Sequence, residues 1–328
     1  MKIWMGLPAF LHAKLIAAPA TPPAVGAIAK PDARVGTLPQ LPGVYRFMVG
    51  DVRITTLSDG TAAQDYHKLL QGITPAATDA ALRSVFEVNP LQTSINAYLL
   101  EIGGRRILID TGTGSLFGPD TAGKLLSALA TAGVKPDQID DIMLTHVHAD
   151  HMGGLVQDGK VVFPNAVIHY GQPDMAFFVG PVVPGKSHGN AELSKQARDM
   201  LQPYIDAGKV STFSAETTLA PGLTAIPHPG HTPGSAFYRL VNKGQRIVFV
   251  GDIVHAAAVQ FASPSVSIVY DAEPTLAIAV RKKAFAELAA SRTLVAVPHM
   301  SFPGVGHIRV AGAGFEWVPI DNADWPNR

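Results

Sequence analysis

Residues 145–154 read Thr145-His146-Val147-His148-Ala149-Asp150-His151-Met152-Gly153-Gly154, directly after an apolar run that predicts a strand. Four side chains that bind metals fall within six positions: His146, His148, Asp150 and His151. If the strand geometry persists, His146 and His148 project from the same side, and Asp150 with His151 can turn toward a second centre. A histidine-rich surface loop or a single structural metal is the alternative. The spacing and the strand-to-glycine context favour a pair of cations.

The composition limits which partners and cofactors we expect. With 328 residues and 47% hydrophobic content, the chain can bury a sizeable core in one large domain or two smaller ones. Its 26 basic and 26 acidic residues balance, so no net charge attracts a polyanion, and nucleic acid is not an expected partner. Because the chain has no cysteine, any metal must be held by nitrogen and oxygen atoms.

The N-terminal segment differs from the rest of the chain. Lys2 precedes a short apolar run at 3–11, and an Ala/Pro-rich stretch follows at 17–27. This pattern fits either an export signal, which would make the protein periplasmic or secreted, or a Pro-rich arm of a cytoplasmic protein. We therefore assign residues 1–40 to this arm or signal and 41–328 to one folded domain. No stretch approaches the roughly 20 apolar residues of a membrane span, so no membrane partner is expected.

Short strands alternate with loops and a few amphipathic helices from Tyr45 onward. Apolar runs that end near Gly, Asp or His predict strands at 52–57, 94–102, 106–110, 142–145, 223–226, 236–241 and 246–250. Apolar residues at helical spacing predict helices at 121–132, 191–207 and 274–290. Polar and histidine-rich segments follow the strand ends, which is where α/β architectures place their chemistry.

The segment from His146 to His151 resembles the HxHxDH signature of the metallo-β-lactamase superfamily. Further family elements occur in the expected order between residues 45 and 319. They are Asp110-Thr111-Gly112, His231 within 230–234, Gly251-Asp252 and Pro298-His299. The resemblance implies an α+β fold, a four-layer αβ/βα sandwich with the site at one edge of two facing sheets.

The resemblance also implies a set of metal ligands. It assigns seven residues to two divalent cations, expected to be zinc: His146, His148 and His231 to one, Asp150, His151 and His299 to the other, with Asp252 bridging both. Taken alone, a histidine after a strand is more often structural, and Gly-Asp is a common turn. Three ligands for each metal and a shared one leave positions for solvent, which is typical of catalytic sites. Asp110 and Asp59 are interpreted as acceptors that orient ligands or loops.

Five segments outside the metal motif resemble one branch of the superfamily, methyl parathion hydrolase and its lactonase and arylesterase relatives: residues 45–61, 116–119, 258–261, 281–286 and 301–309. A β-lactamase is disfavoured, because class B enzymes lack the bridging aspartate. Methyl parathion hydrolase would carry arginine, leucine and leucine at the positions of Leu69, His255 and Tyr270. A hydrogen-bonding His255 suits a carbonyl ester or lactone better than an apolar-lined phosphotriester pocket. Alternatively, His255 only packs against the metal site.

We therefore expect a metal-dependent hydrolase of lactones and aryl esters, such as dihydrocoumarin, with a bridging hydroxide as nucleophile. The expected catalytic residues are Asp252 and His255, and the expected substrate-binding residues are Leu69, Phe117, Phe178, His255 and Tyr270. Phe261 fits a substrate wall or the core equally well. The substrate would be small, neutral and partly apolar, and the family resemblance favours a homodimer. Alternatives are a phosphotriesterase, an acyl-homoserine lactonase, an iron enzyme with an oxidative role, and a non-catalytic metal-binding domain.

Overall fold

The computed structural model describes residues 40–41, 43–118, 121–181 and 190–323. The described residues from Leu41 onward belong to one compact unit. Apart from Gln40, the arm or export signal predicted for residues 1–40 lies outside the described residues. Within the described ranges, no helix is both long enough and apolar enough to cross a membrane.

The first large sheet has seven strands in the described part of the chain, in the order β1-β2-β4-β5-β6-β9-β10. These strands are β1 (Val44–Val49), β2 (Val52–Gln64), β4 (Leu91–Ile102), β5 (Arg105–Ile109), β6 (Asp141–Met143), β9 (Val167–Gly171) and β10 (Val210–Phe213). Neighbours from β1 to β5 pair antiparallel, whereas β5, β6, β9 and β10 pair parallel. Parallel pairing requires crossover connections, and helices occupy several of them.

The second large sheet also has seven strands among the described residues, in the order β11-β12-β13-β14-β16-β17-β18. These strands are β11 (Thr217–Ala220), β12 (Leu223–Pro227), β13 (Ala236–Asn242), β14 (Gln245–Phe249), β16 (Leu294–Ala296), β17 (Val305–Ala311) and β18 (Gly314–Pro319). Only β14 and β16 pair parallel in this sheet as described. The long helix α8 (Pro274–Ser291) lies between them in the sequence.

The remaining elements are helices and two small strand pairs that surround the two sheets. The α-helices are α1 (Tyr66–Leu69), α2 (Pro75–Ser84), α3 (Leu125–Thr131), α4 (Ala149–Met152), α5 (Gln172–Asp174), α6 (Ala191–Asp206), α7 (Ala257–Gln260) and α8. The other helical turns are η1 (Pro136–Gln138), η2 (Gly153–Leu155) and η3 (Met175–Val179). Two small antiparallel pairs complete the set: β3 (Leu70–Gln71) with β15 (Ser267–Ile268), and β7 (Val156–Gln157) with β8 (Lys160–Val161).

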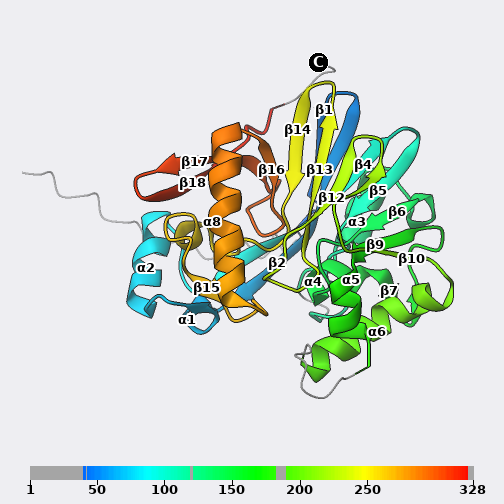
Figure 1. Cartoon of the computed structure of the whole chain (residues 1–328), viewed down its shortest axis with the longest axis horizontal. Coiled ribbons are helices and arrows are strands. Elements are labelled where there is room, and N and C mark those ends of the chain that lie inside the picture. Colours follow the sequence, from blue (N-terminus) through cyan, green and yellow to red (C-terminus); the bar gives the residue numbers. More distant parts are fainter. Residues whose placement is uncertain (1–39, 42, 119–120, 182–189, 324–328) are drawn as a thin grey trace, which may run out of the picture. The chain divides into compact units, whose positions relative to one another are not determined.

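The two large sheets face each other across a shared hydrophobic layer, and helices cover their outer faces (Figure 1). On β5, Ile107 and Ile109 point into the layer between the sheets, while Leu108 points to the opposite face. This alternation follows from the two-residue period of a strand, and the apolar run is continuous because both faces are buried. Helix α8 packs Phe285 and Leu288 against the second sheet. The predicted four-layer α+β sandwich is therefore confirmed.

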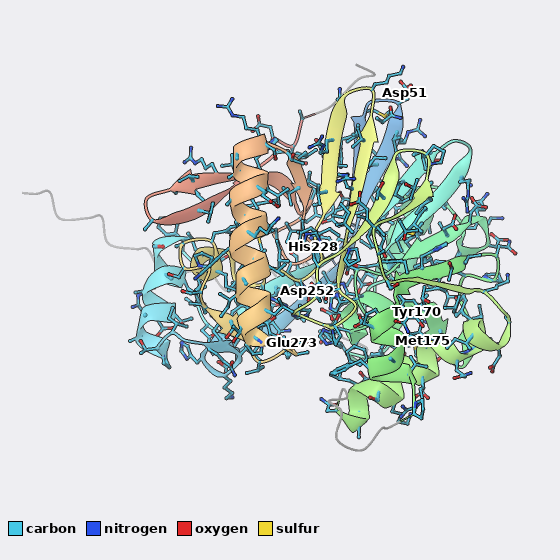
Figure 2. All side chains as sticks on the ribbon, in the orientation of Figure 1. Asp51, Tyr170, Met175, His228, Asp252 and Glu273 are labelled. Carbon is cyan, nitrogen blue, oxygen red and sulfur yellow. The ribbon has the colours of Figure 1, made fainter. Side chains whose placement is uncertain are left out.

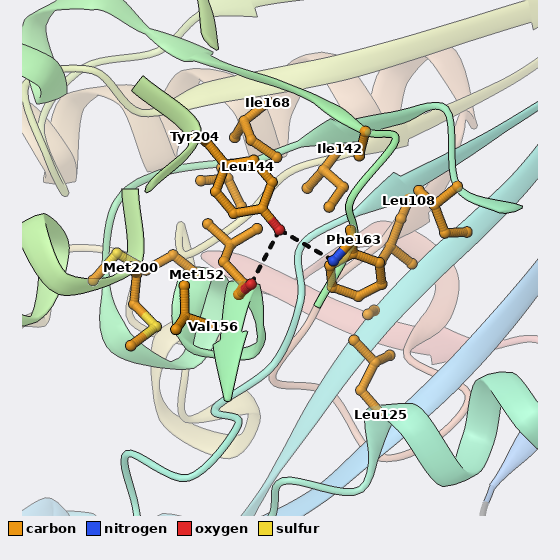
Figure 3. Close-up of a cluster of buried hydrophobic side chains, with 14 of the residues drawn as sticks. Leu108, Leu125, Ile142, Leu144, Met152, Val156, Phe163, Ile168, Met200 and Tyr204 are labelled. Carbon is orange, nitrogen blue, oxygen red and sulfur yellow. Dashed lines mark hydrogen bonds between the residues drawn. The ribbon is translucent and has the colours of Figure 1, made fainter. Parts of the chain in front are cut away.

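The outer layer of the first sheet is built from α3, α6 and the loops around them (Figure 3). Tyr204 of α6 is buried there, and its hydroxyl donates to the carbonyl of Leu155 (3.0 Å) and accepts from the N–H of Phe163 (3.2 Å). A buried hydroxyl needs such partners, because leaving it unpaired costs about 1–3 kcal/mol. These bonds fix α6 against the loop that follows the histidine-rich segment.

One predicted helix begins later than expected. The sequence predicts a helix at 121–132, but α3 begins at Leu125. Ala122 and Gly123 have positive φ angles of 49° and 70°, so the chain there cannot be a right-handed helix. The N–H groups of Gly123 and Leu125 instead donate to the carboxylate of Asp59 (3.0 and 2.9 Å).

Candidate metal centre

The predicted ligands lie at one edge of the two sheets, on segments that follow or precede strands. His146 and His148 are in the loop after β6, and Asp150 and His151 begin the short helix α4. The three others come from the loop before β13, from the end of β14 and from the end of β16: His231, Asp252 and His299. Figure 2 shows Asp252 between the strands and the first half of α8. Residues up to 153 positions apart in the sequence therefore converge on this edge.

The structure brings all seven residues together in two groups that share Asp252. One group is His146, His148, His231 and Asp252; the other is Asp150, His151, Asp252 and His299. Within each group the candidate ligand atoms all lie within 4.8 Å of one another. These are the two groups that the family resemblance implies.

The carboxylate of Asp252 faces both groups. Its Oδ1 lies 3.2 Å from Nε2 of His151 and 3.1 Å from Nε2 of His299. Its Oδ2 lies 3.4 Å from Nε2 of His231 and 3.6 Å from Nε2 of His146, and it also lies 3.1 Å from Nε2 of His299. His148 presents Nδ1, which lies 3.0 Å from Nε2 of His146 and 3.1 Å from Nε2 of His231. One carboxylate can thus serve two centres.

Buried atoms at this site lack the partners that a purely structural polar cluster would supply. Nε2 of His151 and Oδ1 of Asp252 are buried and make no hydrogen bond within the described part of the chain. Buried polar atoms are normally paired, so unpaired ones that point at each other need another partner. Imidazole nitrogens and carboxylate oxygens in this number suit zinc and similar divalent cations. The residues therefore fit two metal ions.

Electrostatics favour the metal-binding protonation state for His146, His148 and Asp252. Burial lowers the pKa of His146 and of His148 well below the usual range, and neighbouring histidines add to the effect. Burial alone would raise the pKa of Asp252, but the surrounding histidines, first His151 and His299, outweigh it and hold this pKa well below its usual range. Neutral imidazole and ionised carboxylate are the ligand forms of these groups. By contrast, Asp252 and the other nearby carboxylates outweigh burial and raise the pKa of His151, His231 and His299, which would lose a proton when metal binds.

Three acceptors orient the ligand rings from behind. Nδ1–H of His151 donates to Oδ2 of Asp110 (2.9 Å), as expected for an orienting aspartate. Nδ1–H of His231 donates to Oδ1 of Asp271 (2.9 Å), and Nδ1–H of His299 donates to the carbonyl of Ser94 (2.9 Å). Each bond leaves Nε2 free for a metal. Sequence analysis did not identify the last two acceptors: no motif surrounds Asp271, and a backbone carbonyl has no sequence signature.

A family model described as the metallo-beta-lactamase superfamily matches residues 91–301. This chain belongs to that superfamily. Two solved structures resemble most of it. AbOPH, a hydrolase in the beta lactamase superfamily, is 36% identical with a TM-score of 0.81, over 87% of this chain and 100% of that one. AidC, a dizinc quorum-quenching lactonase solved with the product N-hexanoyl-L-homoserine, is 27% identical with a TM-score of 0.77, over 86% of this chain and 98% of that one.

Sequence relatives with assigned names match a shorter part. A ribonuclease of Thermus thermophilus is 28% identical over 176 residues, which are 48% of this chain and 35% of the ribonuclease. The chain therefore spans about a third of the length of that relative. Because the superfamily supports several reactions on one fold, the reaction has to be argued from the site.

Asp59 fixes a loop of the superfamily fold instead of a metal ligand. Its buried carboxylate accepts from the N–H (2.9 Å) and Oγ1–H (3.0 Å) of Thr113, and from the N–H groups of Gly123 and Leu125. Gly112 has φ 68°, and a Cβ there would lie 2.3 Å from Cγ of Asp59, so this close approach requires glycine. Asp59 thus orients a loop, as the sequence suggested.

We expect Asp59→Ala to destabilise the protein by roughly 3 kcal/mol or more, because several buried donors lose their acceptor at once. Urea denaturation of the metal-free protein measures the change. Asp51→Ala is the control, since Asp51 is exposed and should change stability by less than about 0.5 kcal/mol. Equal stability of the two variants would mean that solvent replaces the Asp59 carboxylate.

A cavity of about 390 Å³ opens onto the two ligand groups. Its lining comprises Gln64, Tyr66, Thr93, Phe117, His148, Ala149, Asp150, Asn190, Leu193, Gln196, Asp252, His255, Ile268, Val269, Tyr270 and His299. Three of the predicted substrate-binding residues, Phe117, His255 and Tyr270, are among them. None of the described lining residues is Lys or Arg, and the carboxylates among them, Asp150 and Asp252, are both candidate ligands.

Two other predicted substrate-binding residues lie elsewhere. Phe178 is 1% exposed and packs its ring edge-on against His148, with 5.6 Å between centroids. It therefore supports a candidate ligand from the core. Leu69 is half-buried against the small cluster beneath β3 and β15 and does not line the cavity. Phe261 belongs to the core, stacked on Phe285 at 4.8 Å.

Sequence analysis missed the polar side chains of the cavity wall. Gln64, Tyr66 and Thr93 come from β2, α1 and β4, and the hydroxyl of Tyr66 lies 2.9 Å from Oγ1 of Thr93. The hydroxyl of Tyr270 donates to Oε1 of Gln64 across the cavity (3.2 Å). Asn190 and residues of α6 form the other side. These residues lie far from the metal motif in the sequence, and nothing in their local pattern marks a binding wall.

Proposed function

We propose that this chain is a binuclear metal-dependent hydrolase of lactones and aryl esters, in the branch that resembles methyl parathion hydrolase. The observation that carries the proposal is the Asp252 carboxylate, shared between two buried ligand groups at the base of a cavity. When bound, two divalent cations would lower the pKa of a water at this site far below that of bulk water, toward about 7, and polarise the scissile carbonyl. Zinc is the cation that best suits these ligands.

The chain's own residues would then orient the substrate and manage one proton. Hydrolysis adds water across the acyl C–O bond, so the leaving oxygen must end with a proton. His255 lines the cavity, with its Nε2 3.1 Å from Oδ2 of Asp252. Its Nδ1 is buried and makes no hydrogen bond within the described residues. We assign His255 to hydrogen-bonding the carbonyl or protonating the leaving oxygen, and Asp252 to holding both centres and relaying a proton.

The cavity lining supports a neutral, partly apolar substrate. Phe117, Leu193 and Val269 supply apolar surface, and neutral amides and hydroxyls supply the polar positions. A phosphorylated or carboxylated substrate would find no arginine or lysine among the described lining residues to bind it. The same argument disfavours nucleic acid, despite the ribonuclease among the relatives.

Two alternatives have specific support. AidC is a lactonase crystallised with an acyl-homoserine product, and its similarity over most of this chain favours an acyl-homoserine lactonase. The segments that resemble methyl parathion hydrolase favour a phosphotriesterase as a side activity. We also propose a homodimer, and export of the protein if the N-terminal segment is a signal; gel filtration and the intact mass of expressed protein test these two proposals.

Initial rates of hydrolysis test the proposed function. Zinc-loaded protein would be given dihydrocoumarin, an acyl-homoserine lactone and an aryl phosphotriester, each with and without prior chelation. We expect a chelator-sensitive rate that is highest on the aromatic lactone. A higher rate on the phosphotriester or on the acyl-homoserine lactone would select that alternative, and no hydrolysis of any substrate would remove all three.

We expect His255→Leu to slow the hydrolysis of alkyl lactones by about 100-fold, the usual contribution of a general acid or hydrogen-bond donor. Activated aryl esters should lose much less, because a phenoxide leaves without protonation. The measurement is kcat/KM on an alkyl lactone and on a 4-nitrophenyl ester. His67→Leu, at a surface histidine paired with Asp79, is the matched control and should change neither rate. Equal losses on both substrates would show that His255 does not protonate the leaving oxygen and that it only packs against Asp252.

A further inference from the structure

Arg281 of α8 is fully buried, at 0% exposure. Its Nε donates to the carbonyl of Ile253, and its Nη1 donates to the carbonyls of Val266 (2.8 Å) and Pro264 (3.3 Å). Its Nη2 lies 3.6 Å from Oδ2 of Asp271. Arginine keeps its charge in proteins, so burying it is costly unless its fork is paired on several sides. Nε and Nη1 are hydrogen-bonded to backbone carbonyls, and Nη2 makes no hydrogen bond within the described residues but forms an ion pair with Asp271. The placement of the guanidinium is therefore specific.

Three of the four partners of Arg281 adjoin the metal centre or the cavity. Ile253 follows Asp252, the carboxylate shared by the two ligand groups. Val266 precedes the segment 268–270 that lines the cavity. Asp271 accepts from the Nδ1–H of His231 through one oxygen and from the N–H of Ile268 (3.2 Å) through the other. One guanidinium therefore joins a ligand loop, a cavity wall and the acceptor behind a ligand.

A helix-docking role alone does not explain this arrangement. The same helix already packs Phe285 and Leu288 into the core, which is sufficient to hold a helix on a sheet. Apolar residues can often replace a buried ion pair without loss of stability. The presence of this pair therefore indicates that its charged groups must hold a neighbouring group in place. The partner of Arg281 that carries the opposite charge is the Asp271 carboxylate, whose Oδ1 lies 2.9 Å from Nδ1 of His231.

We propose that Arg281 is a positioning residue for the metal ion held by His146, His148, His231 and Asp252, and that it acts through Asp271. This inference rests on the two-metal site of the proposed function. Acceptors behind a metal-binding histidine typically change metal affinity by about 10–100-fold when removed. Arg281→Met should therefore weaken zinc at the His231 group by about 10-fold or more. The group of Asp150, His151 and His299 should change little, because its orienting acceptors are Asp110 and the carbonyl of Ser94.

The test is competition for zinc against a chromophoric chelator, with anomalous diffraction at limiting zinc to show which group is filled. Arg281→Lys is the second variant: it keeps the charge but carries its donors on a single nitrogen, which cannot reach the separate partners of the guanidinium, and the same loss is expected. Phe285→Leu controls for destabilisation of the same helix and should leave both affinities unchanged. In a double-mutant cycle, adding Arg281→Met to Asp271→Asn should cause little further loss of zinc affinity, since both substitutions interrupt the contact from Arg281 through Asp271 to His231.

Several results would overturn the inference. Unchanged zinc affinity in both Arg281 variants, equal weakening of the two groups, or additive effects with Asp271→Asn would each show that Arg281 does not act through Asp271. If neither Arg281 variant folds, unchanged zinc affinity in Asp271→Asn would also contradict it. Failure of the wild-type protein to bind two zinc ions would instead contradict the proposed function, so the two failures are distinguishable.

Discussion

Removal of divalent metal is expected to abolish hydrolysis and to lower the melting temperature of this protein. Asp252 and its five histidine neighbours are buried and crowded, and unpaired atoms of His151 and Asp252 face one another. Cations that bind only the folded chain stabilise it by about 2.7 kcal/mol for each site at 100 times the dissociation constant. For a domain of this size that corresponds to a fall of roughly 5 °C or more for each site on removal.

The measurement is a pair of thermal scans and rate assays on chelated protein, with metal content determined in parallel. Activity should fall by more than about 1,000-fold, because the shared water loses the cations that activate it. Zinc should restore both the rate and the melting temperature, whereas calcium, which prefers six to eight oxygen ligands, should restore neither. A protein that is free of metal by analysis and still active would contradict the two-metal site.

The sequence predicted the half of the site that is local. His146, His148, Asp150 and His151 lie within one strand-to-helix turn, so backbone geometry alone brings their side chains near one another. The distant ligand His231 was placed by family resemblance, because no local pattern distinguishes it from a structural histidine. The structure shows these segments meeting at one edge of the sheets, as the resemblance implied.

Long-range packing explains what the sequence could not supply. The run Ile107–Ile109 was recognisable as a strand, since its apolar residues are continuous. The late start of α3 depends on Asp59, about 65 residues earlier, which binds the N–H groups that a helix would otherwise use. Phe178 matched the relatives' pocket, but its place on the buried side of its turn depends on how the π-helical segment 175–179 packs. Such contacts are set by the assembled fold.

The largest single-residue effect is expected at Asp252. Asp252→Asn keeps the size of the side chain but removes the negative charge between the two groups, leaving one carbonyl oxygen in place of the two carboxylate oxygens that contact histidines of both groups. Replacing a residue that merely orients a ligand already weakens metal affinity by about 10–100-fold. Replacing a ligand shared by both metals should therefore have a larger effect, and we expect kcat/KM to fall by more than about 100-fold. Zinc content should fall from two ions for each chain to one or fewer.

Asp174→Asn separates this effect from general damage. Asp174 is as buried as Asp252 and holds the same loops, accepting from the N–H of Val147 (3.0 Å), Oγ1–H of Thr232 (2.8 Å) and the N–H of Gly234 (2.6 Å). It belongs to neither candidate ligand group. This variant should lose stability yet keep two zinc ions, because its carboxylate fixes the backbone beside the ligands without facing them. If Asp252→Asn also kept two zinc ions and near-normal rates, the shared carboxylate would not be a metal bridge, and the histidines and Asp150 would have to hold both cations.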